Sequence, residues 1–170
     1  MRLEDFIANV PDFPEKGIQF KDITPMLNDP DAYKEAIERL AEFGRKVGAN
    51  KVMGPDARGF IIGCPVAYAL GVGFVPVRKP GKLPRKTIEE SYTLEYGKNT
   101  LCIHEDALKK GDKVLIIDDL LATGGTVVAT IDLAKRLGAE VVGIGVVIEL
   151  LELKGRDLLK GYTLESLIKY

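Results

Sequence analysis

The chain has few of the residues that build metal centres and disulfide frameworks. Its 170 residues include two cysteines, one histidine and no tryptophan. Cys64 and Cys102 form neither a CxxC pair nor a Cys/His cluster, which argues against a disulfide scaffold and a structural zinc site. Both lie in apolar segments, so we expect two buried thiols in a reducing compartment. His104 cannot form a histidine metal cluster alone, and we expect it to be structural.

An excess of charge of one sign is also lacking. Lysine and arginine number 24 and aspartate and glutamate 25, which leaves a net charge of −1 and argues against nucleic acid as a partner. No run of 18 apolar residues occurs, and the first residues lack the apolar core of a signal peptide. We therefore expect a cytoplasmic protein that binds neither nucleic acid nor membrane.

The apolar residues that are present predict one α/β domain spanning residues 1–170. Hydrophobic residues make up 46% of the chain, enough for a globular core. Apolar, β-branched runs alternate with segments of helical periodicity, which indicates a doubly wound parallel sheet. The predicted strands begin near residues 51, 72, 113 and 141, and the predicted helices cover 30–47, 60–70 and 126–137. Beyond residue 149 we expect only a short helix.

The most informative stretch covers residues 113–126. A buried strand over 114–117 runs into Asp118 and Asp119, and Thr-Gly-Gly-Thr then precedes a helix. Ligands of open α/β sheets bind at such carboxyl ends of strands. Free N–H groups at the helix start suit a monophosphate, and the two carboxylates suit sugar hydroxyls. The plain alternative is an ordinary turn after a solvated strand end.

Two further loops follow predicted strands and belong at the same edge of the sheet. Asp56 and Arg58 lie in a loop that opens into the next helix, although each is also compatible with an ordinary surface position. Residues 78–86 contain five cations, no acid, two prolines and one glycine. Such a mobile cationic loop suits a pyrophosphate, and a solvated surface loop is the alternative.

A hairpin is predicted after the cationic loop. Residues 92–96 alternate between apolar and polar side chains, 97–100 provide a turn, and 101–104 return. Glu95 then lies on the polar side of a flap next to the cations.

The N-terminal arm contains three prolines and one glycine between residues 11 and 25, which excludes a long helix or a central strand. We expect an extended segment with turns. Phe13 is interpreted as a residue that pins the arm to the domain. For Phe20 the alternatives are the same pinning role and stacking against a planar base.

The stretch at 114–126 resembles the phosphoribosyl-pyrophosphate signature of type I phosphoribosyltransferases. Five further segments occur in the order typical of the adenine-specific branch of that family: residues 11–25, 56–60, 78–84, 91–97 and 149–156. The resemblance covers nearly the whole chain. It implies a hood formed by residues 1–27 and a mobile loop with a hairpin flap over 78–104.

The resemblance also implies a reaction, in which adenine and 5-phosphoribosyl 1-pyrophosphate give AMP and pyrophosphate with Mg²⁺ in purine salvage. The metal would be held mainly by the substrate, and the protein would be a homodimer. Two alternatives remain open: a transferase for another nucleobase, and a non-catalytic regulator that senses phosphoribosyl pyrophosphate.

The family's site residues can be carried over position by position. The phosphoribose group would contact Asp118, Asp119, Ala122, Thr123, Gly124, Gly125 and Thr126. The pyrophosphate would contact Asp56, Ala57, Arg58, Arg78, Lys79 and Lys82, and the Asp56–Ala57 peptide would be cis. Adenine would contact Gln19, Phe20, Lys21 and Leu150, and Glu95 would act as the general acid/base. Arg85 and Lys86 depart from the family pattern. The resemblance therefore does not imply how the loop closes over the pyrophosphate.

Overall fold

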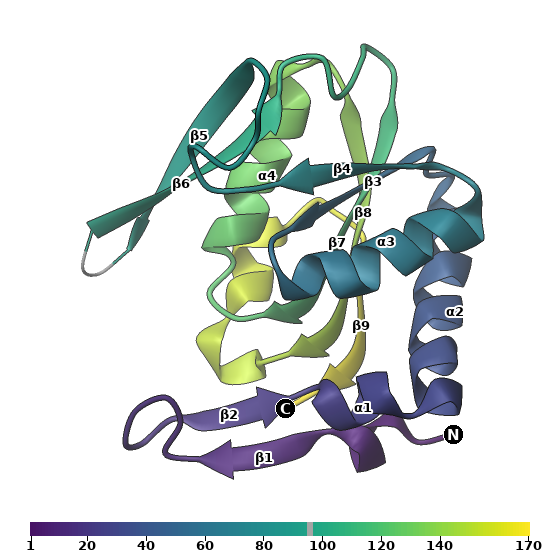
Figure 1. Cartoon of the computed structure of the whole chain (residues 1–170), viewed down its shortest axis with the longest axis vertical. Helices are drawn as coiled ribbons and strands as arrows, with labels where there is room; N and C mark the ends of the chain where they lie inside the picture. The colour runs from purple at the N-terminus through teal and green to yellow at the C-terminus, as the bar shows by residue number, and fades with distance from the viewer. Residues whose placement is uncertain (95–96) are drawn as a thin grey trace.

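A parallel sheet of five strands forms the centre of the molecule in the computed structural model, which describes residues 1–94 and 97–170 (Figure 1). The strand order is β4-β3-β7-β8-β9. The strands are β3 (Lys51–Pro55), β4 (Gly73–Val77), β7 (Lys113–Leu121), β8 (Glu140–Glu149) and β9 (Leu164–Lys169). The sequence predicts the first four. Strand β9 was missed, because its short pattern was interpreted as part of a closing helical segment.

Helices cover both faces of this sheet, which confirms the doubly wound architecture. Helices α2 (Pro30–Val47) and α3 (Arg58–Leu70) pack on one face, and α4 (Gly125–Arg136) packs on the other (Figure 1). In β7, Val114 and Ile116 face the α4 side, whereas Leu115 and Ile117 face the α2 and α3 side. Successive side chains of a strand point to opposite faces, so a central strand must be apolar throughout.

Helix α2 shows how local sequence sets the ends of an element. The Asp29 carboxylate accepts hydrogen bonds from the backbone N–H groups of Asp31 and Ala32 at 3.0 and 2.9 Å, and Pro30 occupies the first turn. Gly48 ends the helix with a φ of 74°. The predicted start of this helix is confirmed.

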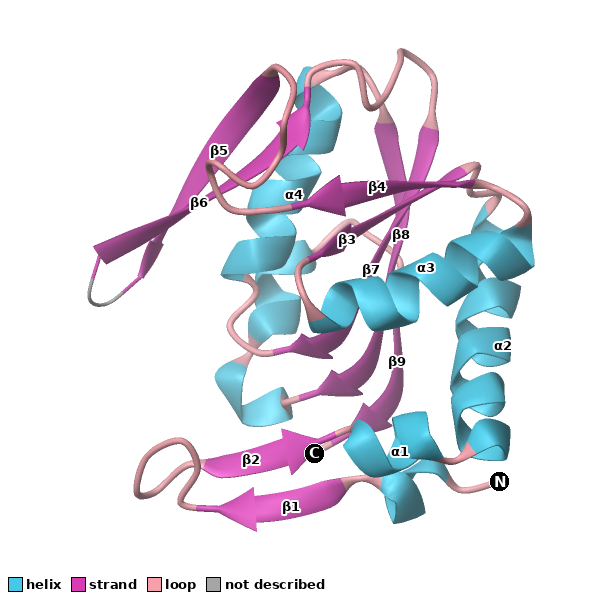
Figure 2. Cartoon of the chain, viewed as in Figure 1, coloured by secondary structure: helices cyan, strands magenta, loops and turns pink. Residues whose placement is uncertain are grey.

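The N-terminal residues, for which we keep the name hood, form a small layer whose Leu3, Ile23 and Met26 are buried in the core on the α2 and α3 side of the sheet. It contains the 3₁₀ turn η1 (Leu3–Phe6), strands β1 (Ala8–Pro11) and β2 (Gln19–Asp22), and helix α1 (Thr24–Asn28). The two strands pair with each other only, in an antiparallel hairpin that lies beside the lower ends of the sheet strands in Figure 2. The prolines thus exclude a place in the central sheet, as predicted.

Strands β5 (Thr87–Leu94) and β6 (Gly97–His104) form the flap, which projects away from the sheet (Figure 2). The predicted turn at residues 97–100 is wrong, because these residues pair in β6 with residues 91–94. The first strand of the flap, β5, also begins earlier than predicted, at Thr87. Glu95 lies outside the described residues.

Both cysteines are free thiols in the described part of the chain. Cys102 is 3% exposed, as predicted for a core thiol. The prediction is wrong for Cys64, which is exposed on α3. That helix is apolar on more than one side, and Cys64 lies with Ile61 and Tyr68 on a face turned away from the sheet. No helix among the described residues is long and apolar enough to cross a membrane.

Candidate active site

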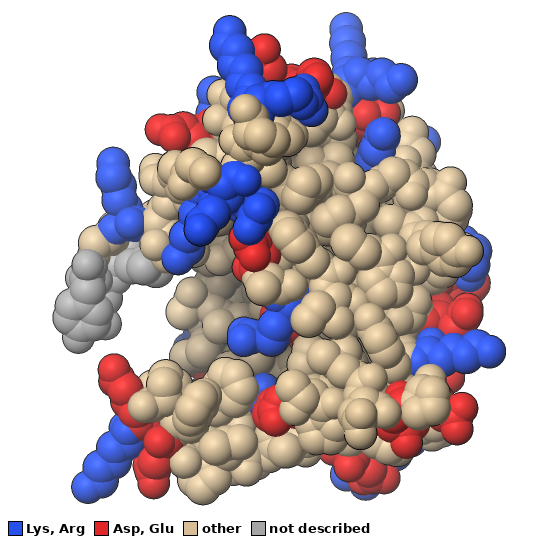
Figure 3. Space-filling view, viewed as in Figure 1, with Lys and Arg blue, Asp and Glu red and all other residues tan. Residues whose placement is uncertain are grey.

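The carboxyl ends of β3, β4 and β7 meet at one edge of the sheet, between the hood and the flap. Figure 3 shows that this face of the molecule is hollowed there, with Lys and Arg side chains gathered over the connection from β4 to β5. Three adjoining pockets in this hollow share lining residues, among them Asp56, Asp118, Tyr92 and Thr126. The predicted crevice is therefore a real feature of the fold.

The first pocket is formed by the β7–α4 turn, which we define as residues 122–126. Gly124 has a φ of 96°, a conformation that glycine adopts at little cost, and α4 begins at the next residue. The first-turn N–H groups of this 12-residue helix have no intrahelical acceptor. The pocket is lined by Tyr92, Asp118, Leu120, Leu121, Ala122, Thr123, Gly124, Gly125, Thr126 and Val127.

The acid pair lies deeper than the sequence predicts. Strand β7 continues to Leu121, so Asp118 and Asp119 lie within the strand and not beyond its end. Asp119 is only 6% exposed, and its carboxylate accepts a hydrogen bond from Arg58 Nε at 2.5 Å. The plain alternative of a solvated strand end is therefore wrong for Asp119, which is buried and whose charge Arg58 compensates.

Asp118 lines two of the pockets and keeps part of its surface exposed. Its Oδ1 accepts the N–H of Asp119 at 2.8 Å. Burial of the carboxylate, followed by the nearby charge of Asp119, raises the pKa of Asp118 well above its ordinary value. The pair thus contains one carboxylate held by an arginine and one that faces the hollow.

The β3–α3 connection supplies the opposite wall. The Asp56–Ala57 peptide is cis, as the resemblance implies. Asp56 accepts a hydrogen bond from Arg78 Nε at 2.7 Å, which ties this connection to the end of β4. Arg58 extends from the first turn of α3. Partial burial lowers its pKa, but the hydrogen bond to Asp119 together with the nearby charges of Asp119, Asp118 and Asp22 raises the pKa above its ordinary value. The structure thus brings these predicted residues together.

The cationic loop also reaches the hollow, but only in part. Arg78, Lys79 and Lys82 line a pocket with Asp56, Ala57 and Thr126, among others. Arg85 and Lys86 instead pair with Asp106 at 2.6 Å and with Glu105 at 3.7 Å, where all four side chains are well exposed. The two residues that depart from the family pattern therefore contact acids that follow β6 and do not line this pocket.

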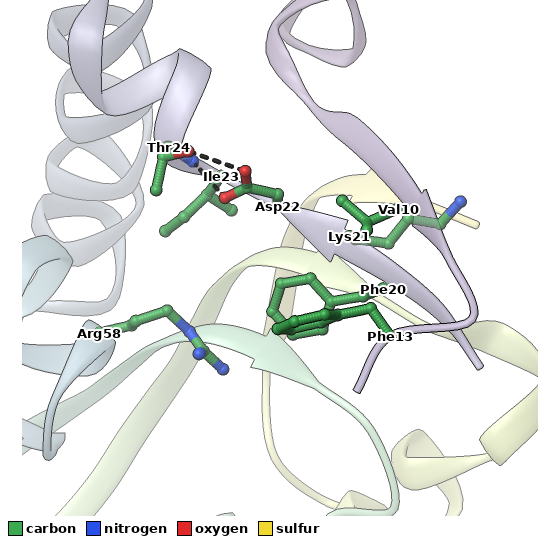
Figure 4. A pocket seen from close by; sticks show the side chains of 8 residues that line it. All are labelled: Val10, Phe13, Phe20, Lys21, Asp22, Ile23, Thr24 and Arg58. Atoms are coloured by element: carbon green, nitrogen blue, oxygen red, sulfur yellow. Dashed lines mark hydrogen bonds between the residues drawn. The ribbon is translucent and has the colours of Figure 1, made fainter. Parts of the chain in front are cut away.

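A fourth pocket lies between the hood and Arg58 (Figure 4). The rings of Phe13 and Phe20 meet edge to face with centroids 5.2 Å apart, and the Arg58 guanidinium lies 5.7 Å from the Phe20 ring centroid. Phe13 does not pin the arm to the domain, since it is 50% exposed and packs on Phe20. The lining is completed by Val10, Lys21, Asp22, Ile23 and Thr24.

The remaining predicted residues lie around this pocket to different degrees. The Gln19 side chain accepts a hydrogen bond from Asn9 Nδ2 at 2.8 Å and is exposed. Lys21 Nζ donates to Asn9 Oδ1 and lies 4.3 Å from the Tyr170 ring centroid. Leu150 follows β8, and among the described residues it is absent from the lining of the hood pocket. Its N–H donates to Leu121 O at 3.0 Å.

Sequence reasoning missed several residues of the site. The Tyr92 hydroxyl is 2.9 Å from Thr126 Oγ1 and accepts from Asn99 Nδ2 at 3.2 Å, which joins the flap to the β7–α4 turn. Asp22 accepts from both the N–H and the hydroxyl of Thr24 at the start of α1. The available signals were the strand alternation around Tyr92 and the Asp-x-Thr pattern before a helix.

The described residues contain no group of three or more His, Cys, Asp or Glu side chains that could hold a metal ion. The described carboxylates that line this hollow belong to Asp56, Asp118 and Asp119. Two of them already accept hydrogen bonds, Asp56 from Arg78 and Asp119 from Arg58. A magnesium ion here would therefore need most of its oxygen ligands from a bound substrate.

Comparisons with known proteins agree with this geometry. The model of the phosphoribosyl transferase domain matches residues 26–167. The adenine phosphoribosyltransferase of Solidesulfovibrio magneticus is 56% identical over 169 residues, 99% of each chain. The crystal structure of adenine phosphoribosyltransferase from Thermoanaerobacter pseudethanolicus is 51% identical, with a TM-score of 0.95 over 99% of this chain and 98% of that one.

A third relative was crystallised with ligands. The adenine phosphoribosyltransferase of Saccharomyces cerevisiae, complexed with an imino-altritol bisphosphate and adenine, is 37% identical with a TM-score of 0.90. The match covers 97% of this chain and 96% of the yeast chain.

Proposed function

The chain belongs to the phosphoribosyltransferase family, and from this premise we propose that it is an adenine phosphoribosyltransferase of purine salvage. It transfers the 5-phosphoribosyl group of 5-phosphoribosyl 1-pyrophosphate to adenine and releases AMP and pyrophosphate. The observation that carries the proposal is one hollow that combines a helix-start turn, a cationic pocket and an aromatic pocket. These three suit the phosphate, the pyrophosphate and the base.

The phosphoribose group is assigned to the β7–α4 turn and the acid pair. The N–H groups of residues 122–126 and the Thr123 and Thr126 hydroxyls hold the 5′-phosphate at the positive end of α4. Asp118 accepts hydrogen bonds from the ribose hydroxyls, and Asp119 sets the position of Arg58. A carboxylate repels the phosphate, so charge alone places the phosphate at the turn and the ribose hydroxyls at the acid pair.

The pyrophosphate is assigned to the opposite pocket, where the Asp56–Ala57–Arg58 connection meets Arg78, Lys79 and Lys82. Their cations neutralise the leaving group as negative charge develops on it. Phosphoribosyl pyrophosphate itself would hold most of the ligands of Mg²⁺, which would help these cations to screen the same charge. In this proposal the cationic loop and the flap move, and this movement lets pyrophosphate leave the site.

Adenine is assigned to the hood pocket. Phe20 offers a stacking face. Leu150, which lies outside the described lining of this pocket, is assigned to the other side of the ring from the family resemblance alone. Strand β2 pairs with β1 on one edge only, so alternate residues of β2 have backbone N–H and C=O groups on its second edge. We assign the backbone contacts to the base to Gln19 and Lys21, which are alternate residues of this strand. A backbone carbonyl accepts from the 6-amino group of adenine, whereas the 6-oxygen of hypoxanthine requires a donor.

Bond breaking at C1 of the ribose leaves positive charge on the sugar and negative charge on pyrophosphate. The acid pair lies on the sugar side of the site and the cations on the other, so each charge develops near its complement. Glu95 handles the proton of the attacking adenine nitrogen. This role is supported by the flap motif at residues 91–97 and stays a prediction.

We also propose a homodimer that works in the cytoplasm. Tyr68 is 90% exposed and Ile61 40% exposed on the face of α3 that also carries Cys64. Apolar residues three and four positions apart form one stripe on a helix, which a second copy of the chain would cover. The two free thiols support a reducing compartment.

The experiment is incubation of the protein with phosphoribosyl pyrophosphate, Mg²⁺ and one nucleobase at a time. We expect AMP from adenine, with kcat/KM for hypoxanthine and guanine lower by up to about 10⁴-fold, because a lost hydrogen-bonding group leaves buried partners unpaired. Comparable kcat/KM for hypoxanthine would overturn the base assignment. Binding of phosphoribosyl pyrophosphate without product from any base would favour the regulator.

A further inference from the structure

The β7–α4 turn rests on a second segment of backbone. Residues 151–159, which we call the back segment, lie one residue beyond β8 and contain the 3₁₀ turns η2 (Leu151–Leu153) and η3 (Gly155–Leu159). A Cβ atom added at Gly155 would lie 2.4 Å from Ala122 O and 3.1 Å from Leu121 Cδ1. A Cβ added at Gly124 would lie 3.1 Å from Gly155 O. The two loops therefore touch backbone to backbone.

The need for glycine at position 155 is steric. Gly155 is buried, and it is not among the glycines with a positive φ, so alanine could adopt its backbone conformation. A distance of 2.4 Å to a backbone oxygen is below any real Cβ contact, and backbone cannot swing aside as a flexible side chain does. Any side chain here must displace the carbonyl of Ala122 or the back segment.

An ion pair between the buried carboxylate of Glu149 and the exposed Arg156 fixes the back segment. Glu149, at the end of β8, is 2% exposed and accepts hydrogen bonds from Arg156 Nε at 3.0 Å and Arg156 Nη2 at 2.8 Å. Ser166 of β9 donates to the same carboxylate at 2.5 Å. These bonds, from Arg156 above all, lower the pKa of Glu149. A two-pronged arginine contact of this kind fixes direction as well as distance.

We propose that Gly155, held in place by the Glu149–Arg156 pair, is a positioning residue that sets the shape of the β7–α4 turn for the 5′-phosphate. The inference rests on the proposed function, in which this turn holds that phosphate. Gly155 acts through the Ala122 carbonyl, whose peptide continues into the N–H groups of the turn. Converging N–H groups bind an anion well only when they are held within a few tenths of an ångström of the productive geometry.

The test compares Gly155→Ala with Gly73→Ala. Gly73 is exposed, lies at the start of β4 and meets only the flexible Lys51 side chain, so alanine is tolerated there. For each variant, calorimetry measures the Kd of ribose 5-phosphate, and steady-state kinetics gives KM for phosphoribosyl pyrophosphate and for adenine. We expect Gly155→Ala to raise both the Kd of ribose 5-phosphate and the KM for phosphoribosyl pyrophosphate by about 10- to 100-fold.

In the same variant the adenine KM should stay within about twofold of wild type, because the hood pocket does not include the back segment. Gly73→Ala should match wild type in all three measurements. A folded Gly155→Ala protein with wild-type affinity for ribose 5-phosphate overturns the proposal. So does an equal loss for adenine and ribose 5-phosphate, which would indicate general damage.

Arg156→Lys and Arg156→Gln repeat the test without a new Cβ at position 155, and they decide the matter if Gly155→Ala does not fold. Lysine keeps the charge beside Glu149 but loses the second prong, and glutamine loses both. We expect the affinity for ribose 5-phosphate to decrease from wild type to the lysine variant and again to the glutamine variant. The adenine KM should stay the same in all three. Equal ribose 5-phosphate affinity in all three would refute the role of the pair.

Calorimetry with ribose 5-phosphate needs neither a base nor turnover, which separates the two proposals. If wild type binds ribose 5-phosphate but makes no AMP, the proposed function fails and the Gly155 variant still decides this inference. If wild type does not bind ribose 5-phosphate, the assignment of the turn is wrong and the inference is overturned with it.

Discussion

At the scale of single residues, two adjacent carboxylates in a buried strand require a physical explanation. Like charges this close oppose joint ionisation, and burial adds to the cost. The protein compensates one of them, since Arg58 donates to Asp119, and leaves Asp118 facing the hollow with a raised pKa. Groups held in unfavourable ionisation states are typical of functional sites.

The first prediction is that Asp118→Asn stabilises the protein while it impairs the reaction. A raised folded pKa means that the folded state binds the proton more tightly than the unfolded state does. The contribution of Asp118 to wild-type stability is therefore largest below the ordinary carboxyl pKa of about 3.9 and is lost as pH rises through the raised value. Asparagine carries no charge and removes this loss of stability at neutral pH. Tm at neutral pH should therefore rise by about 2–4 °C for each kcal/mol that the substitution adds to the free energy of unfolding.

Thermal unfolding across pH measures the effect. The two proteins should have similar Tm in acid, and the variant should gain as pH rises. Loss of a charged hydrogen bond to the ribose, worth about 1.5–3 kcal/mol, should lower kcat/KM for phosphoribosyl pyrophosphate tenfold or more. A variant with lower Tm and unchanged kcat/KM would contradict both parts.

The second prediction concerns base stacking by Phe20. Phe20→Ala should raise the adenine KM by about five- to 150-fold, since stacking of a base on an aromatic side chain contributes about 1–3 kcal/mol. Phosphoribosyl-pyrophosphate affinity should change little. Ile18→Ala is a matched control, because Ile18 is 44% exposed in the same hairpin loop and does not line the pocket. Steady-state kinetics with both substrates checks the prediction, and an unaltered adenine KM removes the stacking role.

At the scale of elements, the connection from β4 to β5 divides its cations between two tasks. Lys79 and Lys82 line the pocket that contains Asp56 and Thr126. Arg85 and Lys86 pair with acids at the end of the flap. One short loop therefore has a ligand-facing part and a part that contacts the flap, which composition alone does not distinguish.

The third prediction follows from this division. Replacing Lys79 and Lys82 by alanine should lower the affinity for pyrophosphate by about tenfold or more, because charge-assisted contacts to an anion contribute about 1.5–3 kcal/mol. AMP binding should change little, since AMP has no group at that subsite. Calorimetry with both ligands measures the difference. Replacing Arg85 and Lys86 by alanine is the control and should leave pyrophosphate affinity near wild type; equal losses for both ligands in the Lys79/Lys82 variant would indicate a structural role.

At the scale of the whole molecule, the apolar face of α3 is the feature that a single copy of the chain leaves exposed. Tyr68 at 90% exposure is far from the usual state of a large aromatic residue on a helix that packs on the sheet. It lies four positions from exposed Cys64, so one side of α3 packs on the core and another is exposed. In the proposed homodimer a second copy of the chain would cover this exposed side.

The fourth prediction is that charge on this face separates the protomers. Tyr68→Glu combined with Ile61→Glu should shift the protein from dimer to monomer in sedimentation velocity, because buried carboxylates without partners oppose association. Ile18→Glu, which places the same charge on the hood hairpin, should leave the dimer intact. A dimer that persists in the α3 variant would locate the interface elsewhere, and a wild-type monomer would overturn the homodimer itself.

Local chemistry is what made parts of this protein predictable. An apolar run followed by two acids, two glycines and a helical pattern defines a central strand, a ligand-binding end and a helix start, since each depends on neighbours within a few residues. The same holds for the Asp29 cap of α2 and for the prolines that keep the hood out of the central sheet. Where the pattern was weak, as in β9 and at residues 97–100, the prediction was wrong.

Contacts between distant residues were decided by the fold. Arg58 reaches Asp119 across 61 positions, and this contact makes a buried second acid tolerable. Phe13 lies against Phe20 because a hairpin brings them together, and Gly155 lies against Ala122 because β8 returns the chain to the end of β7. Such contacts depend on how sheet and loops pack in three dimensions, and no local pattern of side chains records them.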